Sequence, residues 1–333
     1  MNYIGSKNKL SNFLYSHFCD VVEEKLEDCI VCDAFCGSGA VGKMLKEHGV
    51  KEIIANDQEY YSYVLNQNYI VNSFEWNAKE ERIKYLNALK GVEGKIFQHY
   101  CLGGGEGRMY FSDENGKRID AIRMEIQKWL DQKEITQQEF FFLLASLLES
   151  ADYVANTASV YGAFLKHYKK TAQRALEYKP AIFTPHQKQH KAYNQDINVL
   201  IKKIKGDILY LDPPYNSREY GANYHLLNTI ALYDDFKPQG KTGLREYHRS
   251  RFCKKSEVAN ALEELIAGAN FRYIFLSYNN EGLLSKDQIM EIFSKYGKYD
   301  FREIRYQRFK ADCNRIAKSN HVDEHLHILK KTN

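Results

Sequence analysis

The sequence predicts a doubly wound α/β core that carries a helical insertion. Apolar runs with strand character alternate with stretches of helical periodicity over residues 1–73, and again from residue 186 onward. A glycine-rich loop follows the first apolar run, at the place where open α/β sheets bind ligands. The segment 74–185 interrupts this alternation with helical stretches of its own. These three observations together predict the fold class.

The N-terminal part opens with one βαβ unit. Residues 2–7 form a predicted loop, and apolar side chains at helical spacing predict an amphipathic helix over 8–26. A short apolar strand then spans Cys29–Phe35. After the glycine loop, a helix from about Ala40 to Glu47 leads to a second strand over Lys51–Ala55. This order is typical of the first half of a doubly wound sheet.

The glycine loop itself leaves two ligand classes open. Gly37-Ser-Gly-Ala-Val-Gly42 has the spacing of a dinucleotide-binding turn, and Asp57 follows the next strand as a ribose-binding acid would. An NAD-dependent dehydrogenase is therefore one alternative. Asp33 argues against it, because a pyrophosphate would add negative charge beside this carboxylate. A cationic ligand without phosphate fits the acid better.

The middle and C-terminal parts contribute further elements. A turn is expected at Asp113–Gly116, followed by a helix over Ile119–Leu130. Thr136 opens a capping box for a buried helix over Phe140–Ala151. Near the end of the chain, the apolar residues of 326–329 favour a terminal strand over a metal site.

The strongest chemical signal is Asp212-Pro-Pro-Tyr215. It ends an apolar run, Ile208–Leu211, that reads as a buried strand. Pro213 and Pro214 cannot donate ladder hydrogen bonds, so the strand stops and leaves Asp212 at its carboxyl end. An acceptor side chain, outward carbonyls and the flat ring of Tyr215 together suit an exocyclic amine on a heterocycle. A plain turn is the alternative.

The motifs resemble one enzyme family. Asp212-Pro-Pro-Tyr215 resembles the catalytic motif of amino-group DNA methyltransferases, in the form typical of adenine-N6 enzymes. Asp33-Ala-Phe-Cys-Gly-Ser-Gly39 resembles their motif for S-adenosyl-L-methionine (SAM), which has no phosphate and carries an amino group and a sulfonium. Asn2-Tyr-Ile-Gly-Ser-Lys7 resembles the N-terminal motif of the Dam-type, alpha-order enzymes. The resemblance covers scattered blocks in 2–66 and 190–280.

The resemblance implies a SAM-dependent, Rossmann-like core and site-specific methylation of adenine N6 in double-stranded DNA, with the target base flipped out. The implied catalytic residues are Asp212, Pro213, Pro214 and Tyr215. The implied cofactor-binding residues are Tyr3, Lys7, Asp33, Phe35, Gly37, Gly39, Asp57, Asp196 and Asp212. Asp196 equally fits a helix cap for 197–204. No metal is expected, since Cys29 and Cys32 would point to opposite faces of a strand.

Basic residues concentrate in two stretches. Seven Lys/Arg and one Glu lie in 166–191, and six Lys/Arg and one Glu lie in 241–255. A charge run is usually a solvated face, but basic residues interleaved with aromatics favour a phosphate-binding surface. The candidate DNA-binding residues are Lys169, Lys170, Arg174, Arg218, Lys241, Arg245 and Arg249. We therefore expect target recognition in 74–185, and the catalytic domain in 1–73 and 186–333.

Composition and context narrow the remaining alternatives. A net charge of +4 permits a polyanion partner, and the absence of a long apolar run or signal core predicts a cytosolic protein. The family resemblance implies a prokaryotic or phage/viral origin. The resemblance also implies a role in a restriction-modification system, in which a cognate restriction endonuclease would act separately. A cytosine-N4 enzyme, an RNA methyltransferase and a catalytically silent DNA-binding subunit stay open as alternatives.

Overall fold

The structure is a computed structural model that describes the chain except residues 1–6, 74–75, 77–78, 308–320 and 333. Residue contacts divide the chain into two compact units. The sheet unit comprises the described residues of 5–66, 188–219 and 248–333. The helical unit comprises those of 67–187 and 220–247. The segment 220–247, which the sequence analysis grouped with the catalytic part, thus clusters with the helical unit.

Seven strands form one sheet in the part of the chain that the structure describes, in the order β3-β2-β1-β4-β5-β7-β6. The strands are β1 (Ile30–Asp33), β2 (Glu52–Asn56), β3 (Lys191–Tyr193), β4 (Lys205–Leu211), β5 (Asn270–Asn279), β6 (Gly297–Gln307) and β7 (His321–Lys331). Neighbours from β3 to β5 are parallel, whereas β7 runs antiparallel to both β5 and β6. Strand order reverses between β1 and β4. The doubly wound prediction is confirmed, and this switch point is where such sheets bind ligands.

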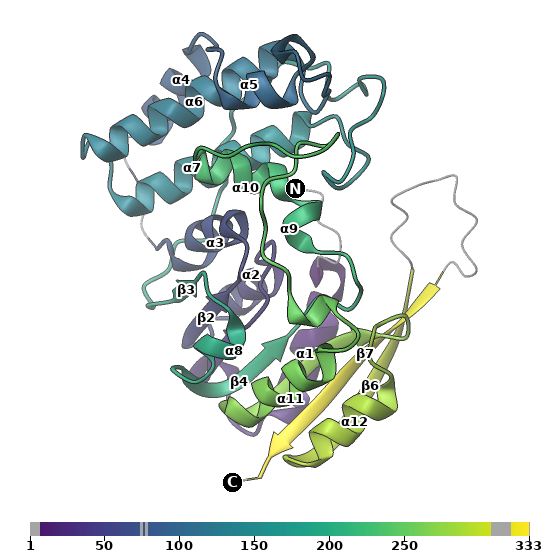
Figure 1. The fold of residues 1–333 in the computed structure, drawn as a ribbon. Helices are drawn as coiled ribbons and strands as arrows, with labels where there is room; N and C mark the ends of the chain where they lie inside the picture. Colours follow the sequence, from purple (N-terminus) through teal and green to yellow (C-terminus); the bar gives the residue numbers. More distant parts are fainter. Residues whose placement is uncertain (1–6, 74–75, 77–78, 308–320, 333) are drawn as a thin grey trace. The chain divides into compact units, whose positions relative to one another are not determined.

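Helices cover both faces of the sheet (Figure 1). They are α1 (Ser11–Val21), α2 (Ala40–Glu47), α3 (Tyr60–Asn66), α8 (Ile197–Leu200), α11 (Val258–Gly268) and α12 (Lys286–Ser294), with short η1 (Lys7–Leu10), η2 (Leu26–Asp28) and η5 (Arg251–Cys253). The helix expected over 8–26 is shorter, and the one expected over 197–204 ends at Leu200. The helix expected from Ala40 to Glu47 is confirmed.

Successive side chains along each strand point to opposite faces of the sheet, so each face has its own hydrophobic core. On one face, the Phe18 ring of α1 packs edge-on against Tyr210 and Phe275, with centroids 5.9 and 4.7 Å apart. On the other face, Leu209 and Leu276 are fully buried in a cluster with α8, α11 and α12. β4 is therefore buried on both sides, which explains why its sequence is a continuous apolar run.

The helical unit contains α4 (Lys79–Ala88), α5 (Lys95–Tyr100), α6 (Asp113–Asp131), α7 (Gln137–Val154), α9 (Tyr220–Asn223) and α10 (His225–Leu232), with η3 (Gln67–Val71) and η4 (Leu102–Gly104). The capping box of Thr136 is confirmed. The turn expected at Asp113–Gly116 is wrong, because Ser112 caps α6 and accepts a hydrogen bond from the Asn115 N–H at 3.4 Å. Gly116 occurs inside this helix because a Cβ there would collide with Cys101 Sγ.

A membrane-spanning helix would have to be both long and strongly apolar. Among the described residues, no helix meets both conditions.

Leu209→Ala should destabilise the sheet unit by about 2–5 kcal/mol, since the side chain is fully buried and lies between Cys32 of β1 and Ile274 of β5. Urea unfolding followed by circular dichroism measures the change. Val199→Ala on α8 is the matched control, because Val199 is 51% exposed and should cost less than about 1 kcal/mol. Equal unfolding midpoints for the two variants would contradict the central position of β4.

Candidate active site

The glycine loop joins β1 to α2 and depends on left-handed backbone at two positions. Gly37 and Gly39 have φ of +49° and +75°, a conformation that glycine adopts without steric penalty. The Gly39 N–H donates to the Cys36 carbonyl at 2.8 Å and closes the turn. Helix α2 begins directly afterwards, at Ala40. The loop thus presents backbone, rather than side chains, at the carboxyl end of β1.

Three side chains hold this loop in place. The Gly37 N–H donates to Asp57 Oδ2 at 2.8 Å. Its carbonyl accepts from Ser62 Oγ at 2.6 Å and from Asn66 Nδ2 at 3.1 Å, both on α3. A Cβ at Gly39 would lie 2.7 Å from Asn66 Oδ1, so the helix also limits the space beside the turn. Asp57 and α3 therefore fix the loop from the side of β2.

Two buried acceptors beside the loop lack a hydrogen-bond partner within the described residues: Asp33 Oδ1 and Asn66 Oδ1. Asp33 is 1% exposed, and burial, followed by the negative charges of Asp212 and Asp57, raises the pKa of its carboxyl well above the usual range. A buried acid in this state is stabilised by a cationic donor. The acceptors therefore fit the amino group of SAM, and the positive charge of SAM is favourable here.

Lys7 links two carboxylates beside the end of β4. Its ammonium lies 2.9 Å from Asp212 Oδ1 and 2.9 Å from Glu324 Oε1 of β7. All three side chains are largely buried, with exposed fractions of 6% for Lys7, 18% for Asp212 and 12% for Glu324. One cation is therefore shared by two acids, and the ionised group carries a net negative charge.

Burial dominates the protonation of this group. It raises the pKa of Asp212 to about 6; Lys7 opposes the increase, and Glu324 adds to it. For Lys7, burial lowers the pKa, but the charges of Asp212 and Glu324 outweigh burial and raise it well above the usual range. Lys7 is therefore charged at neutral pH, while Asp212 changes its charge near pH 6.

An aromatic ring accompanies Asp212 and another accompanies the glycine loop. Tyr215 follows Asp212 closely and makes an edge-to-face contact with Tyr278, at a centroid distance of 6.3 Å. The Leu283 N–H donates to the Tyr215 carbonyl at 2.9 Å and fixes its backbone. Phe35 is held edge-on to Phe252 at 5.1 Å. Both rings are partly exposed, so each retains surface that a planar ligand can contact.

Two predicted cofactor-binding residues, Asp196 and Tyr3, remain to be located. Asp196 caps α8, with Oδ1 accepting from the Asn198 N–H at 2.8 Å. The capping alternative is thus confirmed, and its contact with cofactor stays a prediction. The preceding Gln195 N–H donates to Asn56 Oδ1 at 3.2 Å, which ties this segment to the end of β2. Tyr3 lies outside the described residues.

Some of the candidate DNA-binding side chains are hydrogen-bonded within the protein and some are exposed to solvent, and Arg174 is both. Arg245 forms a two-pronged ion pair with Asp234 at 3.0 and 2.8 Å, and is 10% exposed. Lys169 Nζ donates to the Thr157 carbonyl at 2.8 Å. Arg174 donates to the Tyr153 hydroxyl at 2.6 Å. The exposed members are Lys170, Arg174, Arg218, Lys241 and Arg249.

Glu324, Ser62 and Asn66 are site residues that sequence reasoning missed. Ser62 and Asn66 lie in a plain helix, and no motif marks them. Glu324 did carry a signal, because an acid at an inward position of an apolar strand needs a partner. Further along the same strand, His327 is buried, and the Tyr299 hydroxyl lies 3.0 Å from the Nδ1 atom of His327.

No cluster of three or more His, Cys, Asp or Glu suited to a metal occurs among the described residues.

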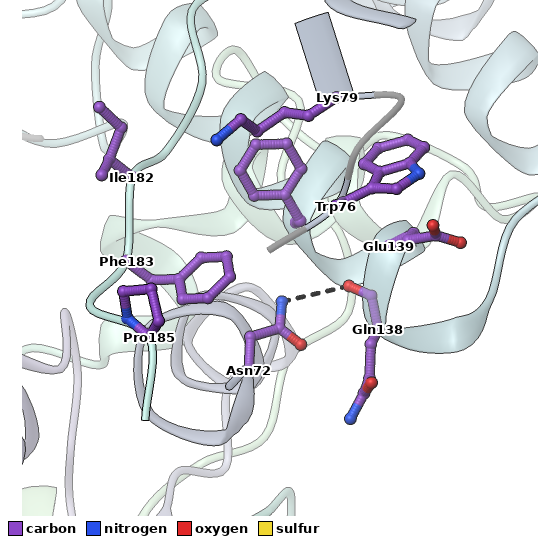
Figure 2. Close-up of a pocket in the computed structure, with 9 residues that line it drawn as sticks. Asn72, Trp76, Lys79, Gln138, Glu139, Ile182, Phe183 and Pro185 are labelled. Atoms are coloured by element: carbon purple, nitrogen blue, oxygen red, sulfur yellow. Dashed lines mark hydrogen bonds between the residues drawn. The ribbon is translucent and has the colours of Figure 1, made fainter. Parts of the chain in front are cut away.

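The helical unit has a cavity of about 190 Å³ that none of the predicted site residues lines. Figure 2 shows the Trp76 and Phe183 rings and the Asn72 amide around it, with Asn72 donating to the Gln138 carbonyl at 3.2 Å. Lys79, Glu139, Phe142, Ile182 and Pro185 complete its lining. The aromatic rings make the cavity largely apolar, and the amides provide polar contacts at one side.

Comparisons with known proteins show which enzyme family the chain resembles. The family model described as D12 class N6 adenine-specific DNA methyltransferase matches residues 3–292. Type II methyltransferase M.NlaIII of Neisseria lactamica is 58% identical over 334 residues, which cover 100% of both chains. Type II methyltransferase M.CviAII of Paramecium bursaria Chlorella virus 1 is 36% identical over 99% of this chain and 98% of that protein. Type II methyltransferase M.FokI of Planomicrobium okeanokoites is 38% identical over 99% of this chain and 53% of that protein.

Gly39→Ala should weaken SAM binding by ~10-fold or more, as measured by isothermal titration calorimetry. The new methyl group would lie 2.7 Å from Asn66 Oδ1 on a backbone with φ of +75°, so the loop has to move. Gly105→Ala is the control, because it has a φ of +89° and open space around its Cβ. It tests backbone strain alone and should leave the affinity within about twofold. Unchanged SAM binding in Gly39→Ala would remove the loop from the cofactor site.

Proposed function

This chain belongs to the D12 class of N6 adenine-specific DNA methyltransferases, and we propose that Asp212 and Tyr215 act directly on the adenine. The enzyme transfers a methyl group from SAM to the N6 amino group of adenine in DNA. One observation carries the assignment of roles. Asp212 directly follows β4 at the switch point of the sheet, next to the glycine loop and 2.9 Å from a buried ammonium. A hydrogen-bond acceptor there adjoins the place where SAM is expected.

Access to the amine requires base flipping, because the duplex stacks and pairs the adenine, and extrusion costs a few kcal/mol. Tyr215 stacks on the extruded base. Asp212 and the Pro213 carbonyl accept the two amine hydrogens, which withdraws the nitrogen lone pair from the ring and directs it outward. SAM supplies the electrophilic methyl group. The side chains work by positioning and electrostatics, so no strong base is needed.

The proposed cofactor contacts follow the donors and acceptors of the loop. Asp33 receives the amino group of SAM, and the backbone of Gly37 and Gly39 allows close approach. Asp57 has one oxygen on the Gly37 N–H and the other on the Glu59 N–H at 2.9 Å, and a carboxylate has further lone pairs for ribose hydroxyls. Phe35, Tyr3, Lys7 and Asp196 are the further members of the proposed cofactor site.

The helical unit is the proposed site of target recognition on double-stranded DNA. The support is its exposed basic residues, Lys170, Arg174 and Lys241. Arg218 and Arg249, which are exposed in the sheet unit, are proposed phosphate contacts as well. The names of the relatives as type II methyltransferases support a role in restriction-modification, in which a separate endonuclease would cut the unmethylated site.

Asp212→Asn should lower methyl transfer by ~100-fold or more, since the amide replaces the carboxylate acceptor at the amine. The assay is tritium transfer from labelled SAM to unmethylated genomic DNA, with the modified nucleoside identified by mass spectrometry. N6-methyladenine is the expected product, and DNA binding by gel shift should stay within about threefold. Asp300→Asn, an exposed acid on β6, is the control and should stay active.

Full activity in Asp212→Asn would refute the role of this carboxylate. Label on cytosine would leave the proposed mechanism of methyl transfer in place but change the target base. Label on RNA but not on DNA would exclude the proposed duplex substrate.

The rate of methyl transfer should fall as the pH drops below about 6. Burial raises the pKa of Asp212 to about 6, so the carboxylate is ionised above this pH and protonated below it. The protonated form has lost its charge as an acceptor, so the rate should decrease about tenfold per pH unit well below the midpoint. Single-turnover rates from about pH 5 to about pH 8 measure the acid limb. A flat profile would show that Asp212 ionisation does not limit the reaction.

A further inference from the structure

We propose that Glu324 is a positioning residue for methyl transfer, which holds the Lys7 ammonium against Asp212 and offsets its positive charge. The inference rests on the proposed role of Asp212 in binding the adenine amine. Its basis is the 2.9 Å contact of Lys7 Nζ with Glu324 Oε1, in addition to the 2.9 Å contact with Asp212 Oδ1. A buried lysine with two carboxylates is held from two sides, which restricts the orientation of Asp212.

The antiparallel strand β7 explains how a residue near the C-terminus reaches this site. Glu324 pairs with Asn279 of β5 and with Ile304 of β6. Because β7 runs opposite to β5, its first residues lie at the carboxyl end of the parallel strands, where Asp212 follows β4. Only 12% of the Glu324 side chain is exposed, so water offers little competition for the Lys7 ammonium.

Charge balance gives Glu324 a chemical consequence. Lys7 and an ionised Asp212 together are neutral, which would cancel much of the attraction that Asp212 exerts on a cation. Glu324 adds a second negative charge and leaves the group with a net charge of minus one. During transfer, positive charge moves onto the amine nitrogen next to Asp212, and a net negative environment stabilises that charge.

Other titratable groups face the same carboxylate. Asp33 lies at the end of β1, Tyr210 on β4, and Tyr215 just after β4; Asp33 and both tyrosines interact electrostatically with Asp212. Burial is the largest influence on each of them and raises the pKa. Lys7 and Glu324 are the charged groups that act on the pKa of Asp212 itself, Lys7 lowering it and Glu324 raising it.

The test measures the titration midpoint of the Asp212 carboxyl directly, in addition to the rate of methyl transfer. Protein labelled with ¹³C at the aspartate carboxyls is titrated by NMR, and the Asp212 signal is assigned by its absence in Asp212→Asn. Glu324→Gln retains the shape and an acceptor for Lys7 but removes the charge. Since Glu324 raises the pKa of Asp212, the Asp212 midpoint should move down by about one pH unit in this variant.

Glu324→Gln should also lower the plateau rate of methyl transfer by ~10-fold and shift the acid limb in the same direction as the NMR midpoint. A purely structural role would lower the rate at every pH without moving the limb. Glu324→Asp keeps the charge on a side chain that is one methylene shorter. It should keep the Asp212 midpoint close to that of the natural chain and recover part of the rate.

Glu303→Gln is the matched control, because this exposed acid of β6 pairs with His325, the residue that follows Glu324. It removes the same charge from the same strand pair and should leave the Asp212 midpoint within about a third of a unit. An unmoved Asp212 midpoint and an unchanged rate in Glu324→Gln would overturn the proposal. The NMR result does not depend on Asp212 being catalytic, which Asp212→Asn tests separately.

Discussion

The site depends on the burial of like charges at one edge of a parallel sheet. Asp33, Asp57 and Asp212 each follow or end a strand, and burial raises the pKa of all three. A sheet of this kind brings such ends together whether or not their charges repel. Lys7 is the cation that compensates part of this cost, at 2.9 Å from Asp212. The remaining excess of negative charge is unfavourable in the free protein and favourable when a cationic ligand binds.

This electrostatic arrangement requires a rigid frame. Asp57 has a structural role as well as a proposed role in ligand binding, because its Oδ2 accepts a hydrogen bond from the Gly37 N–H at 2.8 Å. Ser62 and Asn66 on α3 donate hydrogen bonds to the Gly37 carbonyl. The loop can therefore be made of glycine, which is intrinsically mobile, and still keep a fixed position. Much of the preorganisation of this site comes from a helix that carries no recognisable motif.

Sequence reasoning predicted the elements whose signals are local. The apolar run of β4, the glycine turn, the helix over 40–47 and the capping box at Thr136 are each specified by neighbouring residues. Sequence reasoning failed where the conformation or the contacts of a residue depend on a partner that is distant in the sequence. Gly116 looked like a turn residue, but it occurs in α6 because Cys101 leaves no room for a Cβ. Glu324 is 317 positions from Lys7, and only the antiparallel insertion of β7 brings them together.

The proposed role of Asp212 at the adenine amine also bears on where the substrate proton goes. An adenine amine that has gained a methyl group carries one proton too many, and a neighbouring group has to accept it or pass it to water. Lys7 cannot accept it, because its two carboxylates raise its pKa and keep it charged. Asp212, with a pKa raised to about 6, is a better acceptor than an exposed aspartate and can still release the proton at neutral pH. The same burial that makes Asp212 costly to ionise therefore makes it suited to a proton that is held briefly and then lost.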